Sequence, residues 1–489
     1  MLRALIIASA VMSLTACPGP SEMDGGMGGG GGRAGGSGGS GGTGGSGGGN
    51  MGTGGGSGVG GGGTGGGSVM PRFDGGWCDL PGSWVHGDAG YYSVAQLDGG
   101  PSPLTWITMP KGFCVHPFAR VGNVRQLRFA PGGELFAASP TMGTTSGGAS
   151  GRSAIVLMPD DDNDGLADSI ITWRSNLPGT QGLMFHDGGF WFQDRTRIMK
   201  EPYTPGQRAP GATPPQAVVD VQVYVDFGHW PKTIDADEQG TVFVTNGGTQ
   251  GETCDPARPF RGGVLAIDGS AGGKLIARGL RNPIYLRCHH DGNNHCFANE
   301  LAKDYSAAQG GREKLIPVRE GDDWGYPCCA SKDLPYLDEC LTCSAATQPL
   351  NMSTTFCQGT ARCSPKCDTT VAENASFIIG DTPFGLEFID NQFPPPWDHR
   401  VYVAVHGAFG TWAGARVVGI SFDPATGMPL PGSNLPGVDA GAMADFLEGW
   451  DIPSHAHGRP TDVTVSPDGR LFLANNQNGE IIWIAPIGR

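Results

Sequence analysis

The sequence predicts an all-β protein, and within that class a six-bladed β-propeller that carries a disulfide-rich loop insertion. Three observations support this prediction: helical periodicity is scarce after the first 68 residues, one strand–turn–strand pattern recurs six times, and nine of the 13 cysteines fall between Cys288 and Cys367. A disordered, glycine-rich linker is expected to precede the propeller. We therefore divide the chain into a signal peptide at 1–16, a lipidated cysteine and linker at 17–68, and a propeller domain at 69–489.

The recurring unit is an alternating apolar run, a turn rich in Pro, Asp or Gly, and a second run of aromatic or β-branched residues. In chain order, the six units begin at Val124, Gly182, Lys232, Ile284, Gly385 and Asp462. Several follow one another at roughly 40–60 residues, with a larger gap at the cysteine-rich segment, and this is the length of propeller blades. A β-sandwich would also contain strands and turns, but it would not repeat one turn motif at blade length.

The N-terminus resembles a bacterial lipoprotein signal. A short basic start is followed by an apolar run from Ala4 to Leu14, which is too short to span a bilayer stably. The run ends in Leu-Thr-Ala-Cys at 14–17, which resembles the lipobox and makes Cys17 the expected lipidation site. The alternative is an ordinary signal peptide that contains a cysteine. Because Pro18 stands where Asp would favour retention in the inner membrane, we expect an outer-membrane lipoprotein of the cell envelope, with the periplasmic or external side left open.

From Gly25 to Gly67 the chain consists almost wholly of Gly, Ser and Thr. Such a segment cannot bury enough apolar surface to offset the entropy of ordering it, so we expect a flexible tether. Roughly 43 residues of this kind have an r.m.s. reach of about 35–40 Å. The formal net charge of −15 argues against nucleic acid and anionic lipid headgroups as partners, so the lipid anchor is the expected membrane contact.

Twelve cysteines remain after Cys17, an even number that favours disulfides in an exported protein. Most of them lie in a segment at about 326–370 that has little periodicity, which we interpret as a loop insertion held by disulfides. The alternatives are a haem or zinc site. Ser344 follows Cys343, so the C-x-x-C-H motif of haem attachment is missing there, and an oxidising compartment disfavours a thiolate zinc site. The pairing of the cysteines stays open.

Several motifs occur in one order along the propeller domain. The longest read Ala-Arg-Gly-Leu-Arg-Asn-Pro at 277–283 and Arg-Glu-Gly-Asp-Asp-Trp-Gly-Tyr-Pro at 319–327. Shorter ones read Gly-His-Trp at 228–230, Val-His-Gly at 405–407 and Gly-Arg-Pro-Thr-Asp at 458–462. In combination they resemble the soluble-type sugar dehydrogenases that use pyrroloquinoline quinone (PQQ), the glucose/sorbosone dehydrogenase family. The resemblance covers nearly all of the domain after the linker.

This resemblance implies a six-bladed propeller that oxidises an aldose or a sorbosone-like aldehyde, passing a hydride to PQQ and then electrons to an external acceptor such as a cytochrome or quinone. PQQ carries three carboxylates, which arginine forks suit. The matching positions imply Arg281, Asn282, His406 and Arg459 as cofactor contacts, and His229 as the general base. By residue type alone, the arginine at 281 could instead pair with a carboxylate, and the histidine at 229 could be a core histidine.

The sequence also departs from the family pattern. After His406 and Gly407 the family usually continues with a Ser-Trp-Asn-Arg-like run, whereas 408–411 reads Ala-Phe-Gly-Thr, so an arginine and an asparagine of the cofactor pocket are missing. Arg416 could replace that arginine if the loop folds back. The stretch 180–182 lacks the histidine that bacterial glucose dehydrogenases use as their base. The alternative function is therefore a non-catalytic propeller that binds a glycan or a protein.

A second expected cofactor is calcium. Aspartates at 160, 162, 164 and 168 form a D-x-D-x-D-G-x-x-D loop, in which carboxylates at alternate positions can wrap one hard cation. The expected ligands are Asp160, Asp162, Asp164, Leu166 and Asp168. The loop lacks the position-twelve glutamate of a complete EF-hand, and a solvated acidic turn is the alternative. We expect a structural calcium that clamps the turn between the first and second blades.

Overall fold

The computed structural model describes residues 75–138, 153–221, 229–248, 262–270, 272–302, 311–326, 329–335, 367, 370–408, 411–454 and 456–488. All of them belong to one unit, Thr64–Arg489. Cys17, the glycine-rich linker and most of the cysteine-rich insertion lie outside the described residues. The only helical element in the described ranges is the short 3-10 turn η1 (Trp77–Asp79), and none of their helices is long and apolar enough to cross a membrane.

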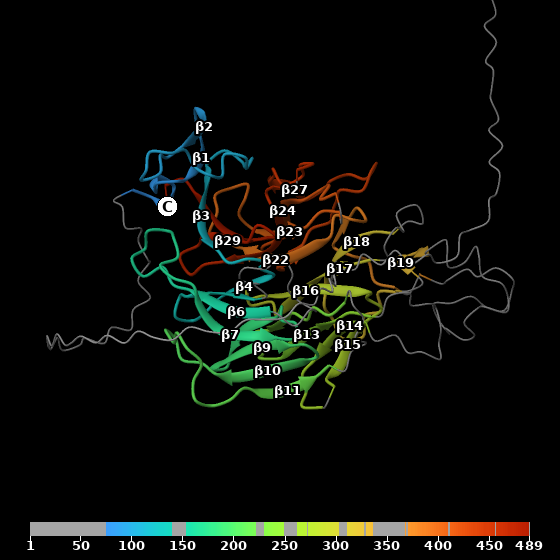
Figure 1. The fold of residues 1–489 in the computed structure, drawn as a ribbon. Helices are drawn as coiled ribbons and strands as arrows, with labels where there is room; N and C mark the ends of the chain where they lie inside the picture. Colours follow the sequence, from blue (N-terminus) through green and yellow to red (C-terminus); the bar gives the residue numbers. More distant parts are fainter. Residues whose placement is uncertain are drawn as a thin grey trace, which may run out of the picture. The chain divides into compact units, whose positions relative to one another are not determined.

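The described strands form a six-bladed β-propeller, as the sequence predicts (Figure 1). The first blade contains β4 (Gln126–Phe129), β5 (Leu135–Ala138), β6 (Ser153–Met158) and β7 (Ile171–Leu177). The second contains β8 (Leu183–His186), β9 (Gly189–Asp194), β10 (Arg197–Pro202) and β11 (Gln216–Asp220). The third contains β12 (Ile234–Ala236), β13 (Val242–Asn246), β14 (Gly263–Ala266) and β15 (Lys274–Arg278).

The fourth and fifth blades follow the same plan with added strands. The fourth contains β16 (Asn282–His289), β17 (His295–Leu301), β18 (Glu313–Pro317), β21 (Ala375–Phe377) and β26 (Gly432–Ser433). The fifth contains β22 (Pro383–Ile389), β23 (Arg400–Val405), β24 (Arg416–Asp423), β25 (Met428–Pro429) and β27 (Met443–Leu447). A separate two-stranded sheet is made by β19 (Cys329–Ser331) and β20 (Leu334–Pro335).

The sixth blade closes the ring by joining the two ends of the domain. It contains β28 (Arg459–Val465), β29 (Leu471–Asn476), β30 (Glu480–Pro486) and the early strand β3 (Phe113–Arg120), with the hairpin β1 (Trp84–Gly87) and β2 (Gly90–Ser93) beyond it. β3 pairs with β30 in antiparallel register along its whole length. The innermost strands β4, β8, β12, β16, β22 and β28 each contact the next, so together they surround the central axis.

Each unit found in the sequence is the innermost strand of a blade with the strand that follows it. The tight turn between the two needs glycine, as at Gly469, whose φ of 90° is a conformation that other residues rarely adopt. The core lies between neighbouring blades. For example, Phe136 of the first blade meets Phe185 and Phe190 of the second, with ring centroids 5.0 Å and 5.2 Å away.

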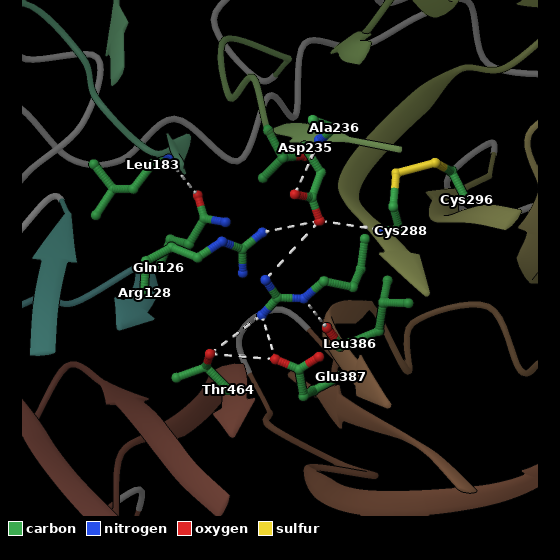
Figure 2. Close-up of polar contacts among 12 residues, drawn as sticks. Gln126, Arg128, Leu183, Asp235, Ala236, Cys288, Cys296, Leu386, Glu387 and Thr464 are labelled. Atoms are coloured by element: carbon green, nitrogen blue, oxygen red, sulfur yellow. Dashed lines mark hydrogen bonds and ion pairs between the residues drawn. A yellow bond between two sulfur atoms is a disulfide. The ribbon is translucent and has the colours of Figure 1, made fainter. Parts of the chain in front are cut away.

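The axis itself is filled by buried charges (Figure 2). Arg128 faces Asp235 at 3.6 Å, and Arg287 pairs with Glu387 at 2.7 Å and donates to the Thr464 hydroxyl at 3.3 Å. These residues come from five different blades, counting β4, β12, β16, β22 and β28. Because a buried charge without a partner is costly, these contacts fix how the innermost strands align.

Three disulfides lie in the described residues, which confirms that the cysteines form disulfides. One joins Cys78 of η1 to Cys114 of β3, and one joins Cys288 to Cys296 across the β16–β17 hairpin. The third joins Cys329 to Cys367 and so ties the start of the cysteine-rich insertion to its end.

Candidate functional site

A cluster of basic and aromatic side chains lies where the innermost strands begin, at one end of the axis. Arg459 opens β28, and its Nε donates to the His406 carbonyl at 2.8 Å while its Nη2 donates to the Gly407 carbonyl. The His406 ring stacks on Phe384 of β22, with centroids 4.3 Å apart. Its Nε2 is buried and has no hydrogen-bond partner. Burial, Arg459 and Arg125 hold the pKa of His406 well below its usual value of 6.5, so the ring is neutral at neutral pH.

Arg125, immediately before β4, is the central residue of the cluster. Its guanidinium carbon lies 5.7 Å from the Trp230 ring centroid and 5.6 Å from that of Phe384, which places the cation between two aromatic rings. The guanidinium makes no hydrogen bond or ion pair with the described residues. Burial lowers its pKa. Burial and the neighbouring Arg125 also lower the pKa of Arg459 to about 9. These two neighbouring cations therefore have no carboxylate partner in the part of the chain that the structure describes.

His229 directly precedes Trp230 in the chain and is buried. Its Nδ1 is hydrogen-bonded to the Gly248 carbonyl, and when Nδ1 carries the proton, the lone pair is on Nε2. The backbone of Gly247 separates His229 from Asn282, since a Cβ at Gly247 would come within 2.6 Å of the His229 Cβ and 3.0 Å of the Asn282 Oδ1. That Oδ1 is buried and has no hydrogen-bond partner.

Lys232 adds a third buried basic side chain, which contacts the backbone of His229. Its Nζ donates to the backbone carbonyls of His229 at 3.1 Å and Pro231 at 3.4 Å, and it makes no ion pair in the described part of the chain. Burial lowers its pKa to about 7, so a nearby anion would favour its charged form.

Of the predicted site residues, the structure brings His229, Asn282, His406 and Arg459 together. Arg281 directly precedes Asn282, but its Nη1 donates to the Ala302 carbonyl at 2.8 Å. This hydrogen bond involves neither Arg125 nor Arg459. The Arg281 backbone still joins the site, because its carbonyl accepts the Gly248 N–H at 2.7 Å.

Arg416 does not supply the missing cation. Its Nη2 lies 3.1 Å from Asp381, and its Nε lies 2.7 Å from Asp445, so both faces of the guanidinium are paired. Arg125 instead supplies a cation near His406. The available signal was its place as the second residue of the first repeated unit, whereas Arg459 stands three residues before the sixth.

The acidic loop after β6 brings three of its four predicted carboxylates together. Ligand oxygens of Asp160, Asp162 and Asp168 all lie within 4.8 Å of one another, which is close enough to hold one cation. Asp164 instead accepts the Leu166 N–H at 2.9 Å and so shapes the turn.

The expected position of this loop, between the first and second blades, is wrong. The loop joins β6 to β7 within the first blade and packs against the closing sixth blade. The Trp483 Nε1 of β30 donates to the Gly165 carbonyl at 2.8 Å, and the Ala167 N–H donates to the Phe118 carbonyl of β3 at 2.9 Å. The error arose because two outer strands of the first blade lie in the interval between the first two repeated units.

Comparison with solved structures finds the same fold. The calcium structure of the Trichoderma reesei Carbohydrate-Active Enzymes Family AA12 protein has a TM-score of 0.58 and 18% identity, and the match covers 78% of this chain and 97% of that one. The holo form of the pyranose dehydrogenase PQQ domain from Coprinopsis cinerea has a TM-score of 0.57 and 17% identity, with coverage of 78% and 97%. A glucose dehydrogenase has a TM-score of 0.51 and 13% identity, with coverage of 77% and 99%.

No protein-family model matches the chain, and no curated protein sequence matches it. The solved structures therefore confirm the resemblance found in the motifs at the level of the fold, a six-bladed propeller.

Proposed function

We propose that this protein is a PQQ-dependent sugar dehydrogenase of the glucose/sorbosone type, which oxidises an aldose or a sorbosone-like aldehyde and passes the electrons to an external acceptor. The observation that carries the proposal is the pair Arg125 and Arg459, two neighbouring cations with no carboxylate paired to either among the described residues. A buried site of this kind favours an anionic ligand, and PQQ is a planar tricarboxylate.

The residues of the site fit this cofactor. Arg125 and Arg459 would hold its carboxylates, since arginine forks match planar carboxylate groups. Trp230, which is partly exposed beside Arg125, offers a flat apolar surface to its rings. The unpartnered Nε2 of His406 and Oδ1 of Asn282 would find hydrogen-bond partners among its polar atoms. When bound, PQQ supplies a quinone that takes the hydride from substrate carbon and is later reoxidised by the acceptor.

His229 is the proposed general base. Its Nδ1 contact with Gly248 orients the ring, so that Nε2 can accept the hydroxyl proton of the substrate as the hydride leaves carbon. Lys232, bound to the His229 carbonyl at 3.1 Å, holds this segment in place.

Calcium is the proposed second cofactor, held by Asp160, Asp162 and Asp168. Since the loop contacts Phe118 and Trp483 of the closing blade, the ion would strengthen the seam at which the propeller closes.

We place the protein at the cell envelope as a lipoprotein anchored through Cys17, a residue outside those that the structure describes. The sequence supports an outer-membrane location. A tether of roughly 43 residues would let the propeller reach a cytochrome or quinone in the envelope.

The test is reconstitution of the purified protein with PQQ and calcium, followed by reduction of an artificial dye in the presence of aldoses and aldehydes. We expect a rise in melting temperature with PQQ and dye reduction with at least one sugar. If PQQ causes no rise in melting temperature and no sugar or aldehyde gives dye reduction, the proposal is overturned. A melting shift with a glycan alone would instead favour the non-catalytic propeller, for which the altered sequence at 408–411 is the supporting observation.

A further inference from the structure

The segment before β3 crosses the last interblade loop of the propeller. We call residues 106–109 the strap, and residues 448–454 and 456–458, which lie between β27 and β28, the strapped loop. Thr108 and Glu448 exchange two backbone hydrogen bonds, each of 3.0 Å. The Trp106 ring stacks on the His457 ring, with centroids 4.0 Å apart and planes 19° apart, and meets Trp450 edge-on at 5.2 Å. The strap thus holds both ends of the loop.

The strap is itself held by the hairpin of β1 and β2. Trp84 of β1 donates from Nε1 to the Ile107 carbonyl at 2.9 Å. The Tyr91 hydroxyl of β2 donates to the Met109 carbonyl and accepts the Met109 N–H, both at 2.8 Å. His86 Nδ1 of β1 also contacts the Met109 carbonyl at 2.7 Å. With these four hydrogen bonds to the hairpin on one side, the strap is a fixed support for the loop on the other.

The loop is shaped to fit the strap. Gly449 has a φ of 124°, and a Cβ there would come within 2.4 Å of the Trp106 carbonyl oxygen, so only glycine allows this approach. The Gly449 carbonyl then accepts a hydrogen bond from His457 Nδ1 at 2.8 Å. The close backbone contact and the stacked ring are therefore parts of one arrangement.

The end of the strapped loop leads directly to the proposed cofactor site. The His457 carbonyl accepts the Asn475 Nδ2 at 2.6 Å, and Arg459 follows two residues later. Gly458 between them leaves no room for a side chain, since a Cβ would lie 2.5 Å from the Asn475 Oδ1. A displacement of His457 would therefore move Arg459 and its contact with the His406 carbonyl.

We infer that Trp106 is a positioning residue for the cofactor site: its stack on His457 sets the place of Arg459. This inference rests on the proposed function, because it assigns Trp106 a role in PQQ affinity. Trp106 does not touch the cofactor in this account and acts only through the strapped loop.

The experiment compares Trp106→Ala and Trp106→Phe with a matched control, Trp397→Ala, in the full chain. Trp106 and Trp397 are both partly buried and pack against the same core cluster, but the Trp397 ring contacts Phe446 and Arg400 and not His457. Both alanine variants should therefore lower the melting temperature of the PQQ-free protein. Only Trp106→Ala should raise the Kd for PQQ, by about threefold to tenfold, as expected for the loss of one aromatic pair. Trp106→Phe should restore most of the affinity.

The same measurements separate a failure of the proposed function from a failure of the positioning role of Trp106. If the wild-type protein binds no PQQ, the proposed function fails. If the wild type binds PQQ and the Kd of Trp106→Ala equals that of Trp397→Ala, the positioning role is wrong, and Trp106 is packing only. If Trp106→Ala does not fold, Trp106→Phe and His457→Ala decide. His457→Ala removes the other ring of the stack, so it must also weaken PQQ binding. Unchanged PQQ binding in His457→Ala would overturn the inference.

Discussion

Replacing Arg125 by methionine should make the PQQ-free protein at least as stable as the wild type while weakening its affinity for PQQ. Methionine keeps the apolar contact with Trp230 and Phe384 but removes a partly buried cation that has no hydrogen bond or ion pair with the described residues. Most substitutions of a buried residue lower stability, so the opposite sign is a specific expectation.

The size of the effect follows from the pKa of Arg459, which falls from 12.5 to about 9. At 1.36 kcal/mol per pH unit, keeping Arg459 charged costs about 5 kcal/mol. Burial is the larger cause, so we assign about 1–2 kcal/mol to the repulsion from Arg125. For roughly 400 residues, the entropy of unfolding is about 0.8 kcal/mol/K, and relief of this repulsion gives a rise of about 1–2 °C. Loss of the cation–π contacts offsets part of that rise, by about 0.5–1 kcal/mol.

The affinity should change in the other direction. A hydrogen bond to a charged group contributes about 1.5–3 kcal/mol, so the Kd for PQQ should rise by about 10-fold to 150-fold. Differential scanning calorimetry and fluorescence titration measure the two effects on the same preparation.

Arg400→Met is the matched control, because Arg400 also lies over a tryptophan, 4.9 Å from the Trp397 ring, but donates to the carbonyls of Pro396 at 2.8 Å and Gly419 at 2.9 Å. Its loss should lower the melting temperature and leave PQQ affinity unchanged. The reasoning is refuted if Arg125→Met melts several degrees below the wild type, or if it binds PQQ as tightly.

Three further predictions concern the base, the axis and the calcium loop. His229→Gln should lower kcat by about 10²–10⁴-fold in the dye assay with little change in the Kd for PQQ. A loss of this size in Asn282→Gln, with none in His229→Gln, would show that His229 is not the general base. Burial raises the pKa of Asp462 from 3.8 to about 7, so between these values the folded state binds more protons and the free energy of unfolding falls as pH rises, by up to about 4 kcal/mol. Denaturant unfolding at pH 4.5 and 7 should show a larger fall in the free energy of unfolding for the wild type than for Asp462→Asn. An equal fall in the two proteins would contradict this prediction. Chelation of calcium should lower the melting temperature of the wild type but not of Asp168→Asn, and equal shifts would exclude this loop as the site.

The sequence predicts the inner half of each blade well and the outer half poorly. Alternating runs such as those beginning at Val124 and Asp462 become innermost strands because both of their faces are buried and a tight turn fixes their register. The outer strand β7 (Ile171–Leu177) is half exposed, so its pattern is weak, and the acidic loop before it was expected between two blades although it lies within the first. β3 also escaped prediction, because its place in the last blade depends on ring closure and not on its own pattern.

For the site residues, the sequence predicts which positions meet better than it predicts where a long side chain points. Asn282 and Arg459 open the innermost strands β16 and β28, and His229 precedes β12. His406 directly follows β23, the second strand of the fifth blade, whose end pairs with the start of β22. A motif can indicate such positions. The direction of a long side chain is set by its neighbours, so no motif could show that Arg281 donates to the Ala302 carbonyl.

The altered loop after His406 removes less from the site than its sequence suggests. In a propeller, the charge of an axial site is the sum of side chains that arrive from several blades, so an arginine lost from one loop can be replaced from another. Arg125 comes from the first blade and reaches Phe384 of the fifth, the residue on which His406 stacks. The anion-binding character of the site therefore depends on Arg125 together with Arg459, and a double substitution of these two arginines should abolish PQQ binding, whereas a cofactor that bound equally well without them would have to be held elsewhere.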